Sequence, residues 1–383
     1  MTGTGGDALL RWADVDVGAL AHNTALIRSR LRPATQVMAM VKAYGYGHGT
    51  ILAAEGALRG GATWLGVFHG REALGLREHG FDVPVLVVGP SLRELLAPLI
   101  TAGVDISILD VDDVPAVAEA AAAAGRSARV QLKIDTGLGR LGVRPGRVDD
   151  LARVLRDHAA RLEVTGMFTH FADADAADPS FTDEQHRRFL AAVDVVRDAA
   201  PQAMLHCAGS AAILRMPETH HNLVRLGIAM YGYVPANVDA PPLRVAMSLF
   251  SRVVQVKTVR ADDTLGYGRT WRATGSRRIA TVGIGYGQGV RIELSNRGAV
   301  VVRGLRAPIV GRVSMDQITV DVSDADGVEV GDEAMLFGEW GGERLGADEV
   351  AEVAGTIPHE IVCGVSSVVE RRRVGAGSAT VST

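Results

Sequence analysis

Short apolar runs alternate with segments of helical pattern along the first two thirds of the chain. Runs of this length are typical of buried parallel strands when helical segments separate them. The predicted strands span residues 35–43, 64–68, 84–90, 105–110, 128–135, 163–171, 203–209 and 223–232. Eight strands separated by helices predict an α/β fold, a (β/α)8 TIM-type barrel rather than an open sheet.

The pattern changes near residue 240, where Pro241 and Pro242 interrupt the chain. Beyond them Val and Ile alternate with polar residues, Gly recurs, and few segments have the period of a helix. Such alternation predicts a mostly β domain. We therefore expect a barrel over residues 15–240 and a C-terminal β-domain over residues 241–383, with residues 1–14 able to pack with the latter.

Polar residues stand at or near the ends of several predicted barrel strands. Barrel active sites form at the carboxyl ends of the strands, so these side chains are expected to converge on one mouth. A structural role could explain any one of these residues, but it does not explain why all of them occur at the same end of the barrel. The set consists of Lys42, Lys133, Asp135, Thr169, His170, His206, Ser210 and Arg225.

Lys42 ends the apolar run in "QVMAMVKAYGYGHGT", residues 36–50. A buried lysine loses hydration, which lowers its pKa and makes its amine nucleophilic toward an aldehyde. The alternative is a strand-end lysine that reaches into water. Lys42 alone does not decide between them.

The same end of the barrel offers a phosphate site. Ser210 opens a short helical segment, Gly227 and Ile228 follow Arg225, and Tyr46 can add a hydroxyl. Barrels bind phosphate on the loops after strands seven and eight. An amine-bearing lysine together with a phosphate site suggests pyridoxal 5′-phosphate.

A metal-dependent barrel hydrolase is the competing enzyme class. Lys133, His170 and His206 could serve as ligands, but the first strand lacks the His-x-His pair of that class, and Arg225 would repel a metal ion. His220 and His221 are adjacent and are expected in a surface loop. We therefore expect no metal site.

The composition excludes several partners. The 383 residues are 47% hydrophobic and 22% charged, with a net charge of −4 and no basic block that would bind nucleic acid. The short run at 371–373 is expected on a solvated face or tail. The N-terminus lacks a signal-peptide pattern, and no apolar segment is long enough for a membrane span. Cys207 and Cys363, both in apolar sequence, fit a reducing compartment, so we expect a cytoplasmic protein.

Eight motifs occur in order from about residue 9 to the end of the chain: VKAYGYGHG, LKIDTGLGRLGV, THFADAD, AGSAA, VRLGIAMYG, LGYGRTW, IGYGQG and GRVSMDQ. Together they resemble the alanine racemases, fold-type III pyridoxal-phosphate enzymes with a barrel and a C-terminal β-domain. The resemblance implies a homodimer with shared active sites that racemises alanine. A racemase of another small amino acid such as serine, and a decarboxylase on the same fold, remain alternatives. A cofactor-binding homeostasis protein is disfavoured because such proteins are typically a lone barrel.

The resemblance also implies the roles of individual residues. Lys42 would hold the cofactor covalently and act as one base, and Tyr267, supplied by the partner subunit, would be the base on the opposite face. Arg225 would contact the pyridine nitrogen, with His170 behind it. Removing a proton from one face and returning it to the other requires two such bases.

The remaining implied roles concern the phosphate, the substrate and the entrance. Arg140 matches the arginine near the substrate carboxylate, and Lys133 matches a lysine that can be carbamylated to hold it. An unmodified Lys133 is an equal alternative. The positions that match phosphate-binding residues are Tyr46, Ser210, Gly227 and Ile228. Met315, with Asp316 beside it, matches a residue of the partner subunit that contacts the substrate. Tyr286 matches a residue that lines the entrance of the active site.

Several positions depart from the family pattern or have a structural alternative. Gly209 stands where the family has Asn, Gln288 replaces an Asp, Tyr44 replaces a small polar residue, and Ser367 falls where many members carry a tyrosine. These departures affect cofactor affinity and the entrance more than the reaction class. His48, His206, Asp135 and Tyr286 can each be explained by hydrogen bonding or packing alone.

Overall fold

The computed structural model describes residues 9–235, 237–239 and 241–375. By their contacts these residues form two compact units. One comprises residues 20–45 and 53–243. The other comprises the described residues up to 19, residues 46–52, and the chain from residue 244 onward.

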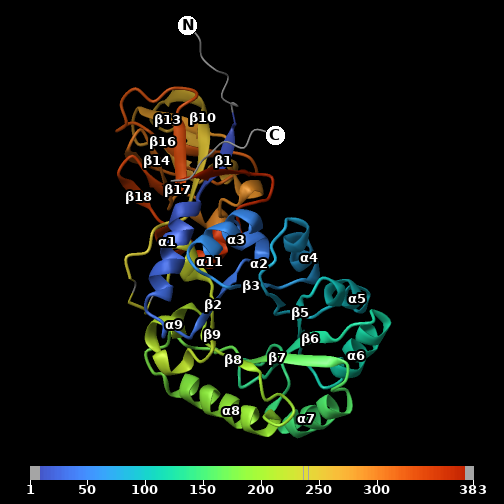
Figure 1. The fold of residues 1–383 in the computed structure, drawn as a ribbon. Coiled ribbons are helices and arrows are strands. Elements are labelled where there is room, and N and C mark those ends of the chain that lie inside the picture. The colour runs from blue at the N-terminus through green and yellow to red at the C-terminus, as the bar shows by residue number, and fades with distance from the viewer. Residues whose placement is uncertain (1–8, 236, 240, 376–383) are drawn as a thin grey trace. The chain divides into compact units, whose positions relative to one another are not determined.

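The first unit contains the predicted barrel of eight parallel strands, which confirms the fold class (Figure 1). Its strands are β2 (Gln36–Met40), β3 (Trp64–Val67), β4 (Val85–Val87), β5 (Asp105–Ile108), β6 (Ala128–Lys133), β7 (Leu162–Phe168), β8 (Met204–His206) and β9 (Leu223–Leu226). Each strand from β2 to β7 pairs with the next, and β2 also pairs with β9. Between β8 and β9 no ladder forms among the described residues. Single backbone hydrogen bonds bridge this seam, from Arg225 to Ala208 (2.9 Å) and from Asn222 to Leu205 (3.1 Å).

Helices surround the strands of the barrel (Figure 1). They are α1 (Val17–Arg28), α2 (Lys42–Tyr46), α3 (Thr50–Arg59), α4 (Gly70–Glu78), α5 (Arg93–Thr101), α6 (Asp113–Ala123), α7 (Val148–Asp157), α8 (Ser180–Val196) and α9 (Ser210–Arg215). In α7, Leu151 and Leu155 lie one turn apart and are both buried, as expected for a helix that covers a sheet with one side.

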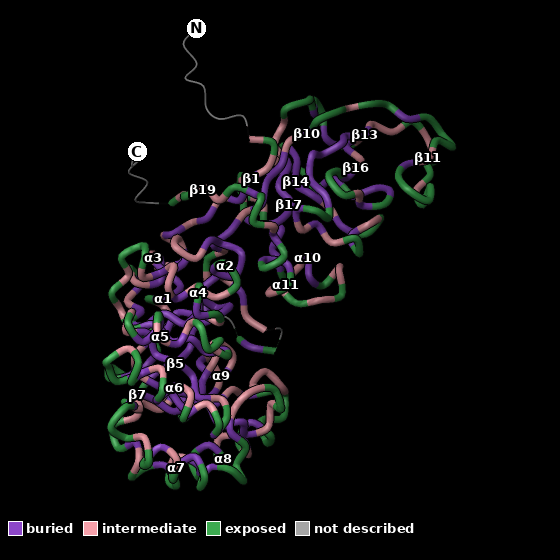
Figure 2. Tube along the Cα trace, turned by 90° about the vertical axis from the view of Figure 1, so that its right-hand side faces the viewer, coloured by how far each residue is buried: buried purple, intermediate pink, exposed green. Residues whose placement is uncertain are grey.

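The second unit is mostly β, as predicted, and contains a nine-stranded sheet. Its strands are β1 (Arg11–Asp16), β10 (Met247–Val259), β13 (Arg277–Val282), β14 (Ala299–Val302), β15 (Leu305–Pro308), β16 (Ile318–Asp321), β17 (Glu333–Trp340), β18 (Glu343–Leu345) and β19 (Glu370–Val374). A two-stranded hairpin, β11 (Thr264–Leu265) and β12 (Trp271–Arg272), and helices α10 (Ala347–Ala354) and α11 (Pro358–Cys363) complete it. Most positions of β14 and β17 and of the first half of β10 are buried (Figure 2).

The two ends of the described chain meet in this sheet. Strand β1 pairs antiparallel with β10 and parallel with β19. The basic run at 371–373 therefore lies in a strand at the end of the sheet rather than in a tail, with Arg371 and Arg372 half-buried and Arg373 exposed. Arg372 binds Asp14 of β1 (2.7 Å) and lies over the ring of Trp12. Such fixed partners explain why three consecutive arginines are tolerated within a sheet.

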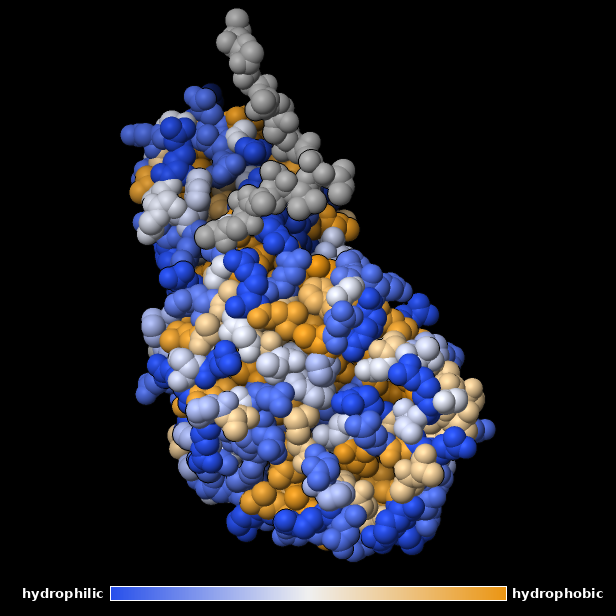
Figure 3. Space-filling model, viewed as in Figure 1, coloured by the Kyte–Doolittle hydropathy of each residue, from blue (hydrophilic) through white to orange (hydrophobic). Residues whose placement is uncertain are grey.

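No helix in the described part of the chain is long and apolar enough to cross a membrane. On the face drawn in Figure 3, hydrophilic side chains are interspersed with smaller apolar groups.

A polar cluster lies inside the barrel around Asp105, the first residue of β5. The carboxylate is fully buried and accepts hydrogen bonds from Arg129 Nε (2.8 Å), Gln131 Nε2 (3.0 Å) and Thr165 Oγ1. It thereby ties together three neighbouring strands. Buried carboxylates require partners of this kind because desolvation penalises an unpaired charge.

Replacing Asp105 with Ala should lower the free energy of unfolding by about 2 kcal/mol or more, because the two buried donors Gln131 and Thr165 and the half-buried Arg129 lose their acceptor. Glu163→Ala is the matched control. Glu163 binds the same Arg129 (3.2 Å) but is exposed, so its loss should cost below about 1 kcal/mol. Urea unfolding of both variants measures the difference, and equal losses would contradict the assigned role of Asp105.

Candidate active site

Arg225 is the centre of the polar cluster at the barrel mouth. It lies in β9 with 5% of its surface exposed. Its Nη1 donates to the carbonyl oxygen (3.0 Å) and Nδ1 (2.9 Å) of His206. Its Nη2 donates to the carbonyl oxygens of Thr169 (2.6 Å) and Cys207 (3.0 Å), and lies 3.1 Å from Nδ1 of His170. These contacts fix the guanidinium with neutral acceptors alone.

The two histidines are neutral in this arrangement. Burial, and after it the cation of Arg225, hold the pKa values of His206 and His170 well below the ordinary value. Since His206 Nδ1 accepts from Arg225, its Nε2 carries the proton and donates to Gln131 Oε1 (2.7 Å). Gln131 in turn donates to Asp105. His206 is thus a satisfied structural histidine, as the sequence alternative expected, and it links Arg225 to the buried carboxylate.

Lys42 begins α2, directly beyond the strand that was predicted to contain it. It is half-buried, and its Nζ lies 5.9 Å from the centre of the Phe68 ring. The next residues, Ala43 and Tyr44, have φ values of 52° and 55°, in the left-handed region that L-residues rarely adopt. Glu72 holds this turn, because its carboxylate accepts from the backbone N–H groups of Ala43, Phe68 and His69 (2.9 Å each). Sequence reasoning missed Glu72, which acts from a different helix.

Lys133 ends β6 and is nearly buried. Burial, together with the positive charges of Arg225, Arg140 and Lys42, lowers the pKa of Lys133 to about 8, whereas Asp135 opposes the shift. Its Nζ lies 5.6 Å from the centre of the Phe168 ring. The barrel therefore contains an amine that is close to losing its proton near neutral pH.

Asp135 shapes the loop that carries Arg140. Its Oδ1 accepts from the backbone N–H groups of Gly137 (3.2 Å) and Gly139 (2.9 Å), and its Oδ2 lies 3.6 Å from Arg144. This is the loop-orienting role that the sequence left open. Arg140 itself is exposed.

The loops after β8 and β9 meet at Ser210. Its Oγ accepts from the backbone N–H groups of Gly227 (3.1 Å) and Ala229 (3.3 Å), and Ile228 between them is buried. Gly209 precedes Ser210 in an extended conformation, and a Cβ there would lie 3.5 Å from His170 Cε1. A larger residue would therefore fit at position 209, and Gly209, which stands where the family has Asn, leaves space beside His170.

The second unit holds the other predicted site residues. Tyr267 is 72% exposed, between Gly266 and Gly268, which have φ values of 70° and 71°. Met315 and Tyr286 are also exposed. The Tyr286 and Met315 segments run side by side, since Tyr286 N donates to Ser314 O and Gly287 N to Met315 O (2.9 Å each).

Asp316 is held by the residue that departs from the family pattern. Gln288 Nε2 donates to Asp316 Oδ1 (2.9 Å), and Gln288 Oε1 accepts from Gly285 N (3.0 Å). An amide at this position pairs with the carboxylate without adding a second negative charge.

Tyr46 is buried within the second unit, whose contacts include residues 46–52. Burial raises the pKa of its hydroxyl far above the ordinary value. His48 Nδ1 lies 2.8 Å from the carbonyl oxygen of Tyr46, consistent with a loop-stabilising histidine. Arg371 of β19 donates to Gly47 O (2.9 Å) and so fixes the same loop.

One prediction from the sequence is wrong here. His220 and His221 do not form an exposed loop. His220 is buried and its Nε2 lies 2.9 Å from Ile213 O, and His221 Nε2 lies 2.8 Å from Nε2 of His186. Cys363, which stands in apolar sequence, is exposed at the end of α11. The two histidines are adjacent in sequence, but each packs against a different part of the fold, His220 against Ile213 and His221 against His186, so neither is on an exposed loop.

The lowered pKa of Lys133 has a measurable effect on stability. At pH values between about 8 and 10 the unfolded chain binds the lysine proton and the folded chain does not, so this residue makes stability rise with pH. Lys133→Met removes the cost of the buried amine. The variant should gain stability relative to the parent chain at about pH 7, and the gain should shrink toward about pH 10.

Urea unfolding of both proteins across this pH range measures the effect. Lys257→Met, a change at an exposed lysine, is the control and should show no such trend. A gain from Lys133→Met that does not depend on pH would contradict the assignment of an unmodified titrating amine.

Comparison with known proteins identifies the family. Residues 15–235 match the N-terminal domain of alanine racemase, and residues 246–373 match the C-terminal domain. The alanine racemase of Desulfosudis oleivorans is 40% identical over 382 residues, which cover 97% of this chain and 98% of that protein. The structure of alanine racemase from Streptomyces coelicolor A3(2) has a TM-score of 0.90 at 37% identity, covering 96% of this chain and 99% of that one.

A third comparison includes a cofactor. The structure of alanine racemase from Bartonella henselae with covalently bound pyridoxal phosphate has a TM-score of 0.85 at 26% identity, covering 96% of this chain and all of that one (100%). The two matched domains span most of the chain in the order that the eight sequence motifs predict. The chain belongs to the alanine racemase family.

Proposed function

We propose that this chain is a pyridoxal-phosphate-dependent racemase that interconverts L- and D-alanine. The observation that carries the proposal is the buried Arg225 at the mouth of the barrel, in a chain of the alanine racemase family. The names of the relatives support alanine over the serine alternative, and they give no support to a decarboxylase.

The residues of the barrel fit the cofactor. Both terminal nitrogens of Arg225 donate to protein acceptors, but its Nε makes no hydrogen bond to any described residue. This remaining N–H is suited to an unprotonated ring nitrogen. The N–H groups of Gly227 and Ala229 gather at Ser210, on the loops where barrels bind phosphate. Tyr46 and Ile228 would complete the phosphate contacts, and Lys42 would hold the aldehyde carbon.

When bound, pyridoxal phosphate supplies an electron sink that acidifies the α-C–H bond of the amino acid. Arg225 limits this effect. Burial lowers its pKa to about 10, which still exceeds neutral pH, so the side chain stays protonated and donates a hydrogen bond without giving up its proton. A ring nitrogen kept unprotonated withdraws less charge, which disfavours transamination as a side reaction.

Two bases on opposite faces would move the proton. Lys42 takes or returns it on one face and Tyr267 on the other. The ordinary pKa of tyrosine is near 10, so a tyrosinate at neutral pH costs about 4 kcal/mol. Arg140, which we assign to the substrate carboxylate, can offset part of this cost. Lys133 would support Arg140, either as an amine or as a carbamate.

We further propose a cytoplasmic homodimer with shared active sites. The exposed side chains of Tyr267, Tyr286 and Met315 support a surface that meets a partner subunit. In the dimer, Tyr267, Met315 and Asp316 would complete the site of the partner, and Tyr286 would line its entrance. Cys207 and Cys363 form no disulfide within the described part of the chain, which supports a reducing compartment.

The absorption spectrum and the activity on alanine test the proposal together. The purified protein should absorb at about 420 nm, as pyridoxal phosphate bound covalently to a lysine does. The circular dichroism of added L-alanine should decay to zero. Absorption without decay would contradict the alanine substrate, and no absorption even after addition of pyridoxal phosphate would contradict the role of Lys42.

Tyr267→Phe should reduce racemisation by about 10²-fold or more, because one of the two bases is lost. In D2O the variant should still exchange the α-proton of one alanine enantiomer through Lys42, and NMR measures this exchange. Lys257→Phe is the control for a change of similar size on the surface of the same unit. Unchanged racemisation in Tyr267→Phe would contradict the two-base assignment.

Mixing two inactive variants tests the shared site. Lys42→Ala and Tyr267→Phe subunits, unfolded and refolded together, should form mixed dimers in which one site has both bases. About a quarter of the parent activity should return if subunits pair at random. No recovery from correctly assembled mixed dimers would show that both bases come from one subunit.

A further inference from the structure

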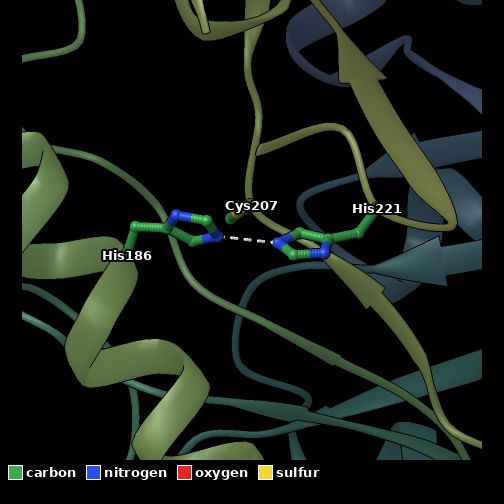
Figure 4. A group of neighbouring side chains, drawn as sticks. All are labelled: His186, Cys207 and His221. Atoms are coloured by element: carbon green, nitrogen blue, oxygen red, sulfur yellow. Dashed lines mark hydrogen bonds between the residues drawn. The ribbon is translucent and has the colours of Figure 1, made fainter. Parts of the chain in front are cut away.

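Three potential metal ligands meet on the barrel apart from the cluster around Lys42 and Arg225. They are His186 of α8, Cys207 after β8, and His221 before β9, and Figure 4 shows Cys207 beside the gap between the two imidazole rings. Their ligand atoms lie within 4.8 Å of one another. We propose that these residues form a site for Zn²⁺ or a similar transition-metal ion. The proposal does not depend on the activity proposed above.

The ring nitrogens already have a spacing close to that of two zinc ligands. Nε2 of His186 lies 2.8 Å from Nε2 of His221. In a tetrahedral site with Zn–N bonds of about 2.1 Å, two nitrogens lie about 3.4 Å apart, and a thiolate sulfur lies about 3.6 Å from each nitrogen. A small separation of the rings and a small shift of the Cys207 side chain would therefore open the position of the ion.

Both histidines are available as neutral ligands. Burial lowers the pKa of His186, and burial with the nearby charges of His186, His220 and Arg32 lowers the pKa of His221 to about 4. One Nε2 now donates to the other. The ring that accepts this hydrogen bond already carries its proton on Nδ1. Neither Nδ1 has a hydrogen-bond partner among the described residues, so the donating ring can move its proton to Nδ1 as well and release Nε2 for the metal without breaking another protein contact.

The thiol of Cys207 supplies the third ligand and, once it has lost its proton, a negative charge that balances part of the charge of the ion. Cys207 is fully buried and its Sγ donates to the carbonyl oxygen of Thr219 (3.1 Å). Burial raises the pKa of this thiol to about 12, so the ion must displace its proton, and one proton leaves to solvent as the metal–sulfur bond forms. Arg225 favours the resulting thiolate. Glu218 and Asp183, the acidic groups near His186, favour a cation at the site.

The set of donors indicates which ion binds. Two imidazoles and one thiolate suit Zn²⁺ and Co²⁺, whereas Mg²⁺ and Ca²⁺ require oxygen ligands. His186 and His221 are only half-buried, so a water molecule can occupy the fourth position.

The site lies at the seam of the barrel. Cys207 follows β8 and His221 precedes β9, the two strands between which the described residues form no ladder, and His186 belongs to α8. The carbonyl oxygen of Cys207 also accepts from Arg225 (3.0 Å). A bound ion would therefore tie the seam together and fix the backbone that holds Arg225.

Cobalt binding provides a test that does not rely on activity. Co²⁺ added to the chelator-treated full-length protein should give the charge-transfer band of a cobalt–thiolate bond and the visible bands of a tetrahedral ion, saturating at one ion per chain. Zn²⁺ added to the metal-free protein should release about one proton and raise the Tm, and it should displace bound Co²⁺ without further proton release. Binding without the thiolate band, or no binding, would overturn the proposal.

Matched variants identify the ligands. His221→Gln and His186→Gln should each weaken Zn²⁺ binding by at least about tenfold, whereas His220→Gln, which alters the adjacent histidine, should bind normally. Cys207→Ser should lose the thiolate band, whereas Cys363→Ser should keep it. Circular dichroism verifies that each variant folds. If Cys207→Ser fails to fold, His186→Gln, a change at a half-buried helix position, tests the site in its place. Equal binding by His221→Gln and His220→Gln would exclude this site.

Discussion

The burial of one permanent cation, Arg225, constrains the barrel more than any other interaction. Moving a guanidinium out of water is costly unless acceptors surround it. In the described part of the chain no carboxylate contacts it, so three carbonyl oxygens and two neutral histidines take that role. Because the acceptors are neutral, the cation keeps its full positive charge.

That charge determines the chemistry of its neighbours. Burial is the main reason why His170 and His206 are neutral and why the pKa of Lys133 is low, and the charge of Arg225 adds to the effect at all three residues. The nearest carboxylate along the hydrogen-bonded chain is Asp105, reached through His206 and Gln131. The interior of the barrel thus contains a continuous polar path from Asp105 at the start of β5 to Arg225 in β9, and every member has a partner.

Arg225 also stands where the barrel closes. Among the described residues no ladder joins β8 and β9, and one of the single backbone hydrogen bonds that bridge this seam comes from the backbone N–H of Arg225. Its side chain holds the carbonyl oxygens of Thr169, His206 and Cys207 on the neighbouring segments. The side chain that positions a cofactor ring in our proposal therefore also joins the strands of the barrel, and the proposed metal site lies against the same seam.

The alternation of apolar runs and helices was sufficient to predict the barrel, because eight buried parallel strands require nearly continuous apolar sequence. The strand ends were predicted too far along the chain. Lys42 and Asp135 fall in turns, where left-handed backbone and side-chain-to-backbone hydrogen bonds replace the ladder. Strand β1 was missed because its charged residues hide the apolar alternation, and its place between β10 and β19 depends on residues more than 200 positions away.

The sequence by itself determined the fold class, the family and the residue types at the mouth of the barrel, since these depend on local periodicity and on motifs of neighbouring residues. Only the tertiary structure decided which of these groups are charged. The pKa of Lys133 and the neutrality of the histidines depend on burial and on cations from other strands. Only the tertiary structure, too, brought His186 and Cys207 to His221, because contacts between distant segments arise from packing and leave no local pattern in the chain.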